Sequence, residues 1–166
     1  MFAGRAALDE LRVPSDAHQR VVDLVVHSEQ LRQVFVPDLL RAPPLLDRFP
    51  QLNVVFAEVD CGWVPYVKEQ IDNNYFRLDP VSRFGLRKPP SEYIAEHFHY
   101  GYMTDTFGLR VRDDVGVDRI LWSNDYPHIS ADWPYSWRTI QASMSGLSPG
   151  EKHLILAGNA ARLYGF

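Results

Sequence analysis

Short runs of apolar residues, each ending at a polar or charged residue, alternate along this chain with stretches of helical periodicity. The clearest run, residues 53–57 (Asn-Val-Val-Phe-Ala), is followed by Glu58, and residues 120–122 (Ile-Leu-Trp) lead to Asp125. Short runs rich in β-branched and aromatic residues are typical of buried strands. We therefore predict strands in both places and a third strand over residues 100–107.

The segments between and after these strands carry helical signals. Residues 63–75 repeat apolar side chains at helical spacing, with charged residues between them. The Ser-Pro-Gly-Glu segment that begins at Ser148 has the order of a helix start with serine as the cap. Residues 76–92 are polar and proline-rich, which predicts a long loop. Further helices are predicted to begin at Ser91 and to cover residues 108–115, 134–144 and 159–164.

The first 44 residues carry a weaker pattern that leaves two interpretations open. Apolar positions at helical spacing over residues 16–40, with Ser15 as the cap, favour a helix. The alternative is a strand over residues 21–26 that ends at His27, where a metal ligand could lie. We favour the helix because the apolar pattern continues past His27.

Strands that alternate with helices predict parallel βα units and an α/β fold. The pattern gives three such units, and a three-stranded parallel sheet has two open edges that proteins usually protect. At 166 residues the chain is long enough for one domain with a real core, so we treat residues 1–166 as a single domain.

Composition excludes several classes of function. The net charge is −4 with acidic and basic residues interspersed, so nothing indicates a nucleic-acid partner. No apolar run approaches the roughly 20 residues of a membrane helix, and residues 1–10 lack the layout of a signal peptide. The single cysteine, Cys61, excludes an intrachain disulfide and fits a reducing compartment, so we expect a cytoplasmic protein with a small-molecule substrate.

Candidate chemistry lies where the predicted strands end. Glu58 ends the first strand, and Asp125 and His128 follow the last one, at the end of a parallel sheet where active sites form. The alternative for Asp125 is a turn cap, for His128 an ordinary loop histidine, and for Glu58 an ion pair with a nearby arginine.

Several other polar or aromatic residues have more ordinary interpretations. Trp63 is expected to pack near the strand ends. Asp105 either supports the site or ends a strand, and Asn159 is expected to cap the last helix. His97 and His99 are expected to face solvent or to pack, because no other metal ligand neighbours them in sequence.

Five segments resemble one known family in order and spacing. They are residues 49–58, 62–65 (Gly-Trp-Val-Pro), 90–93, 116–128 and 158–165. Together they resemble the amidohydrolase-related family, which includes metal-dependent hydrolases and enzymes similar to aminocarboxymuconate-semialdehyde decarboxylase. The resemblance covers residues 45–166 well and residues 1–44 poorly.

This resemblance implies a partial (β/α)8 TIM barrel, made of the last three or so βα units, and a divalent metal, commonly zinc. The family's ligands are a His-x-His or Glu-x-His pair on the first strand, a histidine on the fifth and an aspartate on the eighth. Asp125 matches the last of these and is our candidate metal ligand and catalytic residue. Glu58 stands where decarboxylating members have a histidine, so it is a candidate catalytic base. His128 and Trp63 are candidate substrate contacts.

The implied function is a metal-dependent hydrolase or related decarboxylase that acts on a small carboxylated or cyclic substrate. A closed barrel needs about 250 residues, and most of the family's ligands have no match here. We therefore expect the C-terminal part of a longer enzyme, which binds metal weakly and is inactive alone. The alternative is a non-catalytic partial barrel that self-associates or pairs with a missing N-terminal half.

Overall fold

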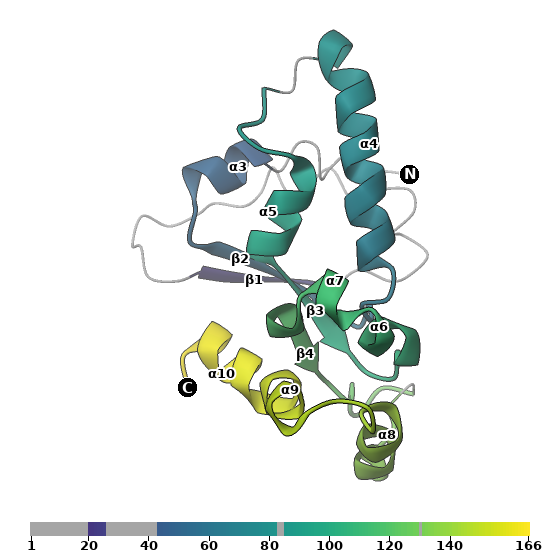
Figure 1. Ribbon diagram of the computed structural model, residues 1–166. Coiled ribbons are helices and arrows are strands. Elements are labelled where there is room, and N and C mark those ends of the chain that lie inside the picture. Colours follow the sequence, from purple (N-terminus) through teal and green to yellow (C-terminus); the bar gives the residue numbers. More distant parts are fainter. Residues whose placement is uncertain (1–19, 26–42, 83–84, 130) are drawn as a thin grey trace.

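The computed structural model describes residues 20–25, 43–82, 85–129 and 131–166. Within these residues the strands form one parallel sheet, in which neighbours in sequence are neighbours in space (Figure 1). The strands are β1 (Arg20–Val25), β2 (Leu52–Ala57), β3 (Phe98–Tyr102) and β4 (Ile120–Trp122).

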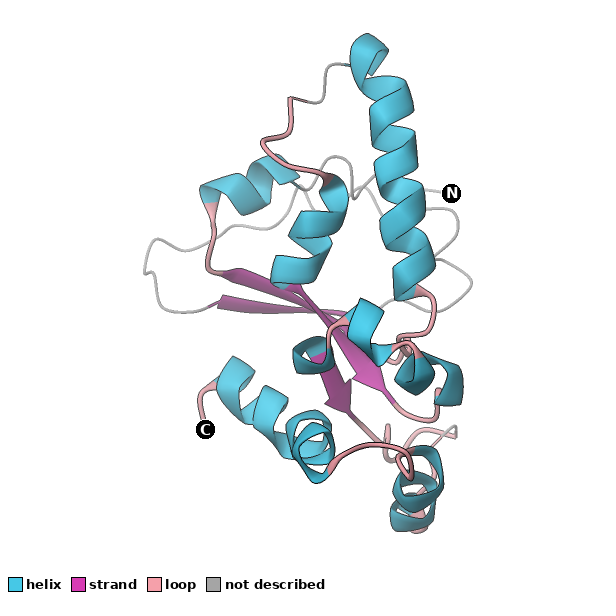
Figure 2. Ribbon diagram, in the orientation of Figure 1, coloured by secondary structure: helices cyan, strands magenta, loops and turns pink. Residues whose placement is uncertain are grey.

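Helices connect each of these strands to the next (Figure 2). Among the described helices, none combines the length and apolar character needed to cross a membrane. The helix α3 (Pro43–Arg48) precedes β2, and α4 (Val64–Ser82) and α5 (Pro90–His97) connect β2 to β3. The segments α6 (Thr106–Arg110), α7 (Arg112–Val115) and the 3-10 turn η1 (Val117–Arg119) connect β3 to β4. After β4 come α8 (Ser136–Ser143), α9 (Pro149–His153), the π-helical turn η2 (Leu154–Gly158) and α10 (Asn159–Tyr164).

The sheet lies between two layers of helices (Figure 1). On one face, α4 and α5 bury an apolar layer against the sheet, in which Ile71 and Tyr93 pack with Phe56 and its neighbours. On the other face, Val55 and Leu121 pack against Leu163 of α10. Burial on both faces explains why the strands have near-continuous apolar sequences rather than an alternating pattern.

The N-terminal strand corrects our preferred interpretation of that region. Residues 20–25 form β1, which pairs in parallel with β2 from Arg20 opposite Leu52 to Val25 opposite Ala57. The helix predicted over residues 16–40 is therefore wrong here, and the rest of that range, with His27, lies outside the described residues. The run Arg-Val-Val-Asp-Leu-Val fits both the helical and the strand period of apolar residues, and pairing with β2 determines that a strand forms.

The loop predicted over residues 76–92 is also wrong in part. Helix α4 runs on to Ser82 and contains Pro80, and α5 already begins at Pro90. Phe76 and Leu78 in the last turns of α4 are 63% and 46% exposed, so this part of the helix buries no apolar stripe that periodicity could detect. At the start of α5, Ser91 is not the cap; its main-chain N–H and hydroxyl donate to Asp72.

The third predicted strand is shorter and begins earlier than expected. β3 ends at Tyr102, and the side chain of Asp105 caps α6, so residues 103–107 leave the sheet. The helix predicted over residues 108–115 is present as α6 and α7, and ends at Gly116 as expected.

The C-terminal helices contain one confirmed and one wrong prediction. Ser148 and Glu151 form the predicted capping box at the start of α9. Asn159 does not cap α10: its buried side-chain amide donates to the carbonyl oxygens of Val117, at 2.8 Å, and Ile120, at 2.9 Å. It therefore ties α10 to the start of β4.

Candidate metal centre

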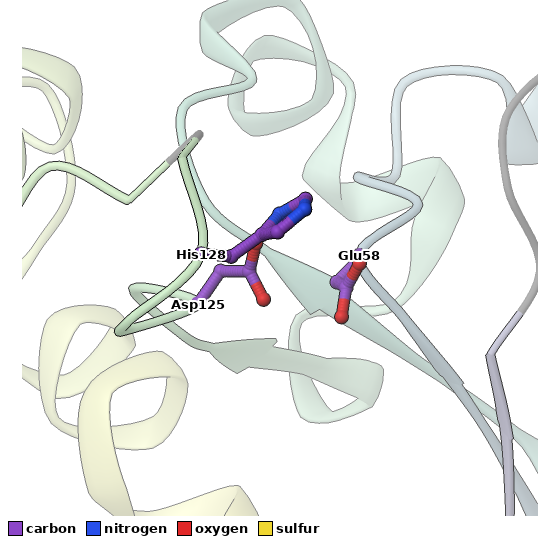
Figure 3. Close-up of side chains that lie close together, drawn as sticks. All are labelled: Glu58, Asp125 and His128. Atoms are coloured by element: carbon purple, nitrogen blue, oxygen red, sulfur yellow. The ribbon is translucent and has the colours of Figure 1, made fainter.

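Three of the predicted site residues converge at the carboxyl end of the sheet. Donor atoms of Glu58, Asp125 and His128 lie within 4.8 Å of one another. Glu58 follows β2 directly, and the other two residues lie on the loop after β4 (Figure 3). Because parallel strands all end at the same edge, residues about 70 positions apart in sequence meet there.

Hydrogen bonds within the loop after β4 join Asp125 to His128. The carboxylate is 11% exposed, and its Oδ2 lies 2.7 Å from Nδ1 of His128, whose ring is 58% exposed. The main-chain N–H of His128 also donates to the carbonyl oxygen of Asp125 at 2.8 Å. A histidine that donates through Nδ1 directs the lone pair of Nε2 away from its partner, which is the arrangement found beside many metal sites.

The turn after β2 holds Glu58 in an uncommon conformation. Glu58 has φ 59° and Asp60 has φ 54°, both in the left-handed region that side chains other than glycine rarely adopt. Asp125 shares this feature with φ 57°. Strained backbone conformations of this kind are common at functional sites, and contacts with the surrounding structure keep them in place.

The donor set fits a divalent transition metal. Two donors that bind one ion at about 2.1 Å are at most about 4.2 Å apart, so the 4.8 Å limit of this cluster requires only a small inward movement. Two carboxylates and one imidazole are ligands that zinc and manganese accept. An ion bound to Nδ1 of His128 would replace its hydrogen bond to Asp125.

The other candidates lie in supporting positions. Trp63 packs edge-on against Phe56 and Tyr100, with ring centroids 6.5 and 5.6 Å away, and its indole N–H donates to Val59 O at 2.9 Å. Its substrate contact stays a prediction. Asp105 accepts from the main-chain N–H groups of Cys61, Gly62 and Gly108, so it braces the turn that carries Glu58.

The two histidines that flank Phe98 pack inside the protein rather than facing solvent. His97 is 5% exposed, and its Nδ1 lies 2.8 Å from Leu52 O. His99 is 6% exposed and lies 3.3 Å from both Asn53 and Arg119. Burial, and then the charge of Arg119, lowers the pKa of His99 to about 4.

Asp60 is a supporting residue that the sequence analysis missed. Its Oδ1 accepts from the main-chain N–H of Met103 at 2.9 Å, which joins the turn after β2 to the end of β3. Burial raises the pKa of Asp60, with the nearby charge of Asp105 acting in the same direction. The only signal in the sequence is the turn composition of Asp60-Cys61-Gly62.

Fold and site together define a part of a parallel α/β barrel whose ionisable side chains gather at the carboxyl ends of the strands. The sequence profile of the amidohydrolase family matches residues 3–166, and the chain therefore belongs to the amidohydrolase family. This confirms the family expected from the sequence.

Several similar proteins are decarboxylases. The gamma-resorcylate decarboxylase of Rhizobium sp. (strain MTP-10005) is 28% identical over 133 residues, which are 75% of this chain and 38% of that enzyme. The 5-carboxyvanillate decarboxylase from Sphingomonas paucimobilis superposes with a TM-score of 0.65 at 22% identity, over 80% of this chain and 40% of that one. A dihydroxybenzoic acid decarboxylase from Polaromonas sp. JS666, solved with manganese and 2-nitroresorcinol, superposes with a TM-score of 0.63 at 21% identity. The match covers 80% of this chain and 40% of that one.

These comparisons confirm the predicted fold class. The structural relatives are TIM-barrel enzymes, and this chain has the α/β fold of a part of such a barrel. The chain spans about 40% of the length of the relatives it matches. Its sheet has one more described strand than the three predicted.

Proposed function

We propose that this chain forms the C-terminal part of the catalytic barrel of a metal-dependent enzyme that acts on a small carboxylated ring compound. The observation that supports this proposal is the convergence of Glu58, Asp125 and His128 within 4.8 Å at the carboxyl end of the sheet. In this proposal Asp125 binds the metal, Glu58 handles a proton and His128 contacts the substrate.

The relatives favour the substrate class. Their names give gamma-resorcylate, 5-carboxyvanillate and dihydroxybenzoic acid as substrates, all of them aromatic carboxylates. One of them holds manganese, so manganese as well as the expected zinc belongs in any test. When bound, the ion would act as a Lewis acid toward a carboxylate or carbonyl oxygen of the substrate.

Glu58 suits either of two reactions. In a decarboxylation, the bond between the ring carbon and the carboxyl group breaks, carbon dioxide leaves, and protonated Glu58 delivers a proton to that carbon. In a hydrolysis, ionised Glu58 accepts a proton from the attacking water. Decarboxylating members of the family have histidine at this position. Glu58 is therefore a residue at which this chain differs from them.

Manganese titration of the purified chain, followed by electron paramagnetic resonance, tests the metal ligand. We expect measurable but weak binding, because most of the family's other ligands have no match among these residues. Asp125→Asn should reduce the affinity at least tenfold, since loss of one charged ligand removes much of the attraction for the ion. Asp72→Asn is the matched control, because the Asp72 carboxylate joins α4 to α5 and is not part of the cluster.

Equal affinities in the wild-type chain and Asp125→Asn would contradict the proposed ligand. Tight, stoichiometric zinc or manganese binding that is lost in Asp125→Asn would support the ligand and contradict the expectation of weak binding. Incubation with manganese and 2,6-dihydroxybenzoate should give no carbon dioxide from this chain alone. Turnover there would show that the chain is sufficient for catalysis.

A second candidate function is a partial barrel that assembles with a copy of itself or with another chain. In the described part of the chain, β1 pairs with β2 alone and β4 pairs with β3 alone. Such strand edges are templates for pairing with further strands. Light scattering after size-exclusion chromatography tests this candidate, and a monomer that keeps its fold at micromolar concentration would contradict it.

A further inference from the structure

We propose that Asp105 is a positioning residue: its carboxylate holds the turn between β2 and α4 in the conformation that places Glu58 beside Asp125. The inference rests on the proposed function, because it assigns Glu58 to the site. It concerns Asp105, which lies after β3 and is not one of the three clustered residues.

The turn after β2 requires an external restraint. Glu58 and Asp60 both have φ near the left-handed helical value, at 59° and 54°. Each such residue raises the energy of the native turn, so a released turn would relax toward negative φ. Relaxation at Glu58 would turn its side chain away, because a change of φ reorients the whole residue.

Asp105 supplies that restraint with both of its oxygens. Its Oδ2 accepts from the main-chain N–H groups of Cys61, at 3.1 Å, and Gly62, at 2.6 Å. Its Oδ1 accepts from the N–H of Gly108 at 2.8 Å, which fixes the carboxylate at the start of α6. Hydrogen bonds to an ionised carboxylate are stronger than those between neutral groups.

Asp60 makes the reciprocal connection. Its main-chain N–H donates to Gly101 O at 3.1 Å, and its Oδ1 accepts from the N–H of Met103 at 2.9 Å. The turn after β2 and the segment after β3 are therefore joined in both directions, by one carboxylate from each side. Glu58 lies two positions before Asp60, within the same turn.

Two glycines allow the Asp105 carboxylate to come this close. A Cβ atom at Gly62 would lie 2.9 Å from Oδ2 of Asp105, and one at Gly108 would lie 2.5 Å from the same atom. At Gly108 the added atom would also lie 2.5 Å from Sγ of Cys61, which is fully buried. The sequence thus has no side chain at the two positions where one would displace the carboxylate.

Asp105→Asn tests the positioning role with little change in shape. The amide keeps one acceptor oxygen but turns an NH2 group toward main-chain N–H donors, so at least one hydrogen bond is lost. Two nuclear magnetic resonance measurements report on the turn without any metal. They are the intraresidue NOE between HN and Hα at Glu58 and Asp60, which is strong at positive φ, and the amide exchange rates of Cys61 and Gly62.

We expect both NOEs to weaken in Asp105→Asn and the two amides to exchange about tenfold faster, as loss of a charge-assisted hydrogen bond predicts. The manganese dissociation constant should rise about tenfold, which is typical for residues that orient metal-site side chains. Asp72→Asn, the control between α4 and α5, should leave all of these values unchanged. A partial return of the NOEs in Asp105→Glu would support a role for the charge.

Each adverse result has a separate meaning. Unchanged NOEs and exchange rates in Asp105→Asn would overturn the proposal. A released turn with unchanged manganese affinity, in a chain whose affinity falls in Glu58→Gln, would also overturn it, because Glu58 would then not need Asp105. If Glu58→Gln leaves the affinity unchanged while Asp105→Asn releases the turn, Asp105 positions Glu58 but Glu58 does not contribute to metal binding.

Discussion

The two ends of the parallel sheet each hold a histidine among polar side chains, but they hold it differently. At the carboxyl end, His128 is 58% exposed and lies 2.7 Å from a carboxylate. At the amino end, His99 is 6% exposed and lies 3.3 Å from the guanidinium of Arg119. One histidine is exposed beside a carboxylate, whereas the other is kept neutral inside the protein.

The two ends of the sheet also differ in backbone conformation. Among the described residues, the non-glycine residues with positive φ are Glu58, Asp60 and Asp125, and all three lie in turns at the carboxyl end. At the amino end, Asn159 bridges α10 to the start of β4 without such strain. In parallel α/β barrels the carboxyl end typically carries chemistry and the amino end stability, and we expect this chain to follow that division.

The largest expected effect is at the amino end, in Asn159→Ala. The change leaves the buried carbonyl oxygen of Ile120 and the part-buried one of Val117 without the amide that now donates to both. We expect a loss of about 3 kcal/mol in the free energy of unfolding, measured by urea denaturation. Asn74→Ala, which removes a single bond to Gln70 O within α4, should cost less than about 1 kcal/mol. Equal losses in the two variants would contradict the stabilising role of the amino end.

A second prediction concerns pH and His99. Because burial and Arg119 lower the pKa of the folded-state histidine from 6.5 to about 4, the unfolded chain binds the proton first as pH falls. The contribution of His99 to stability is complete above pH 6.5 and is lost progressively toward pH 4. Between pH 7 and pH 5 the wild-type chain should lose roughly 2 kcal/mol more than His99→Gln.

Comparing the wild-type chain with His99→Gln cancels the contributions of other titrating groups. If both chains lost the same free energy of unfolding between pH 7 and pH 5, the interpretation of His99 as a buried neutral histidine would be wrong.

The sequence predicted the parts of this molecule that depend on local pattern. The apolar run before Glu58, the capping box at Ser148 and the run before Asp125 each carry their own signal, and each element is present. The convergence of Glu58 and Asp125 fits the parallel topology, because Glu58 directly follows β2 and Asp125 lies on the loop after β4. The family resemblance supplied the barrel, which local pattern does not contain.

What the sequence could not predict depends on partners distant along the chain. β1 forms because β2 offers it a parallel ladder, and its own residues fit a helix equally well. Asn159 has the composition of a cap, but its amide finds two carbonyl groups about 40 positions earlier. Glu58 has a left-handed backbone conformation although neither glycine nor asparagine stands at this position, so composition could not predict it. The contacts that accompany this conformation come from the segment after β3.

The smallest effect has the opposite sign and lies at the carboxyl end. Glu58→Gly removes a non-glycine residue at φ 59°, where glycine has no steric cost. We expect the free energy of unfolding to rise by about 1 kcal/mol, because relief of backbone strain exceeds the entropy that glycine adds to the unfolded chain. Loss of the negative charge beside Asp125 acts in the same direction.

Glu69→Gly is the matched control, since it makes the same replacement on the exposed side of α4. Glycine inside a helix should lower the free energy of unfolding by about 1 kcal/mol, so the two variants are expected to shift the urea midpoint in opposite directions. A stabilised Glu58→Gly chain with weakened manganese binding would mean that the carboxyl end gives up stability in order to hold Glu58. If Glu58→Gly is destabilised as much as Glu69→Gly, the turn after β2 stores no strain, and the proposed division between the two ends of the sheet fails there.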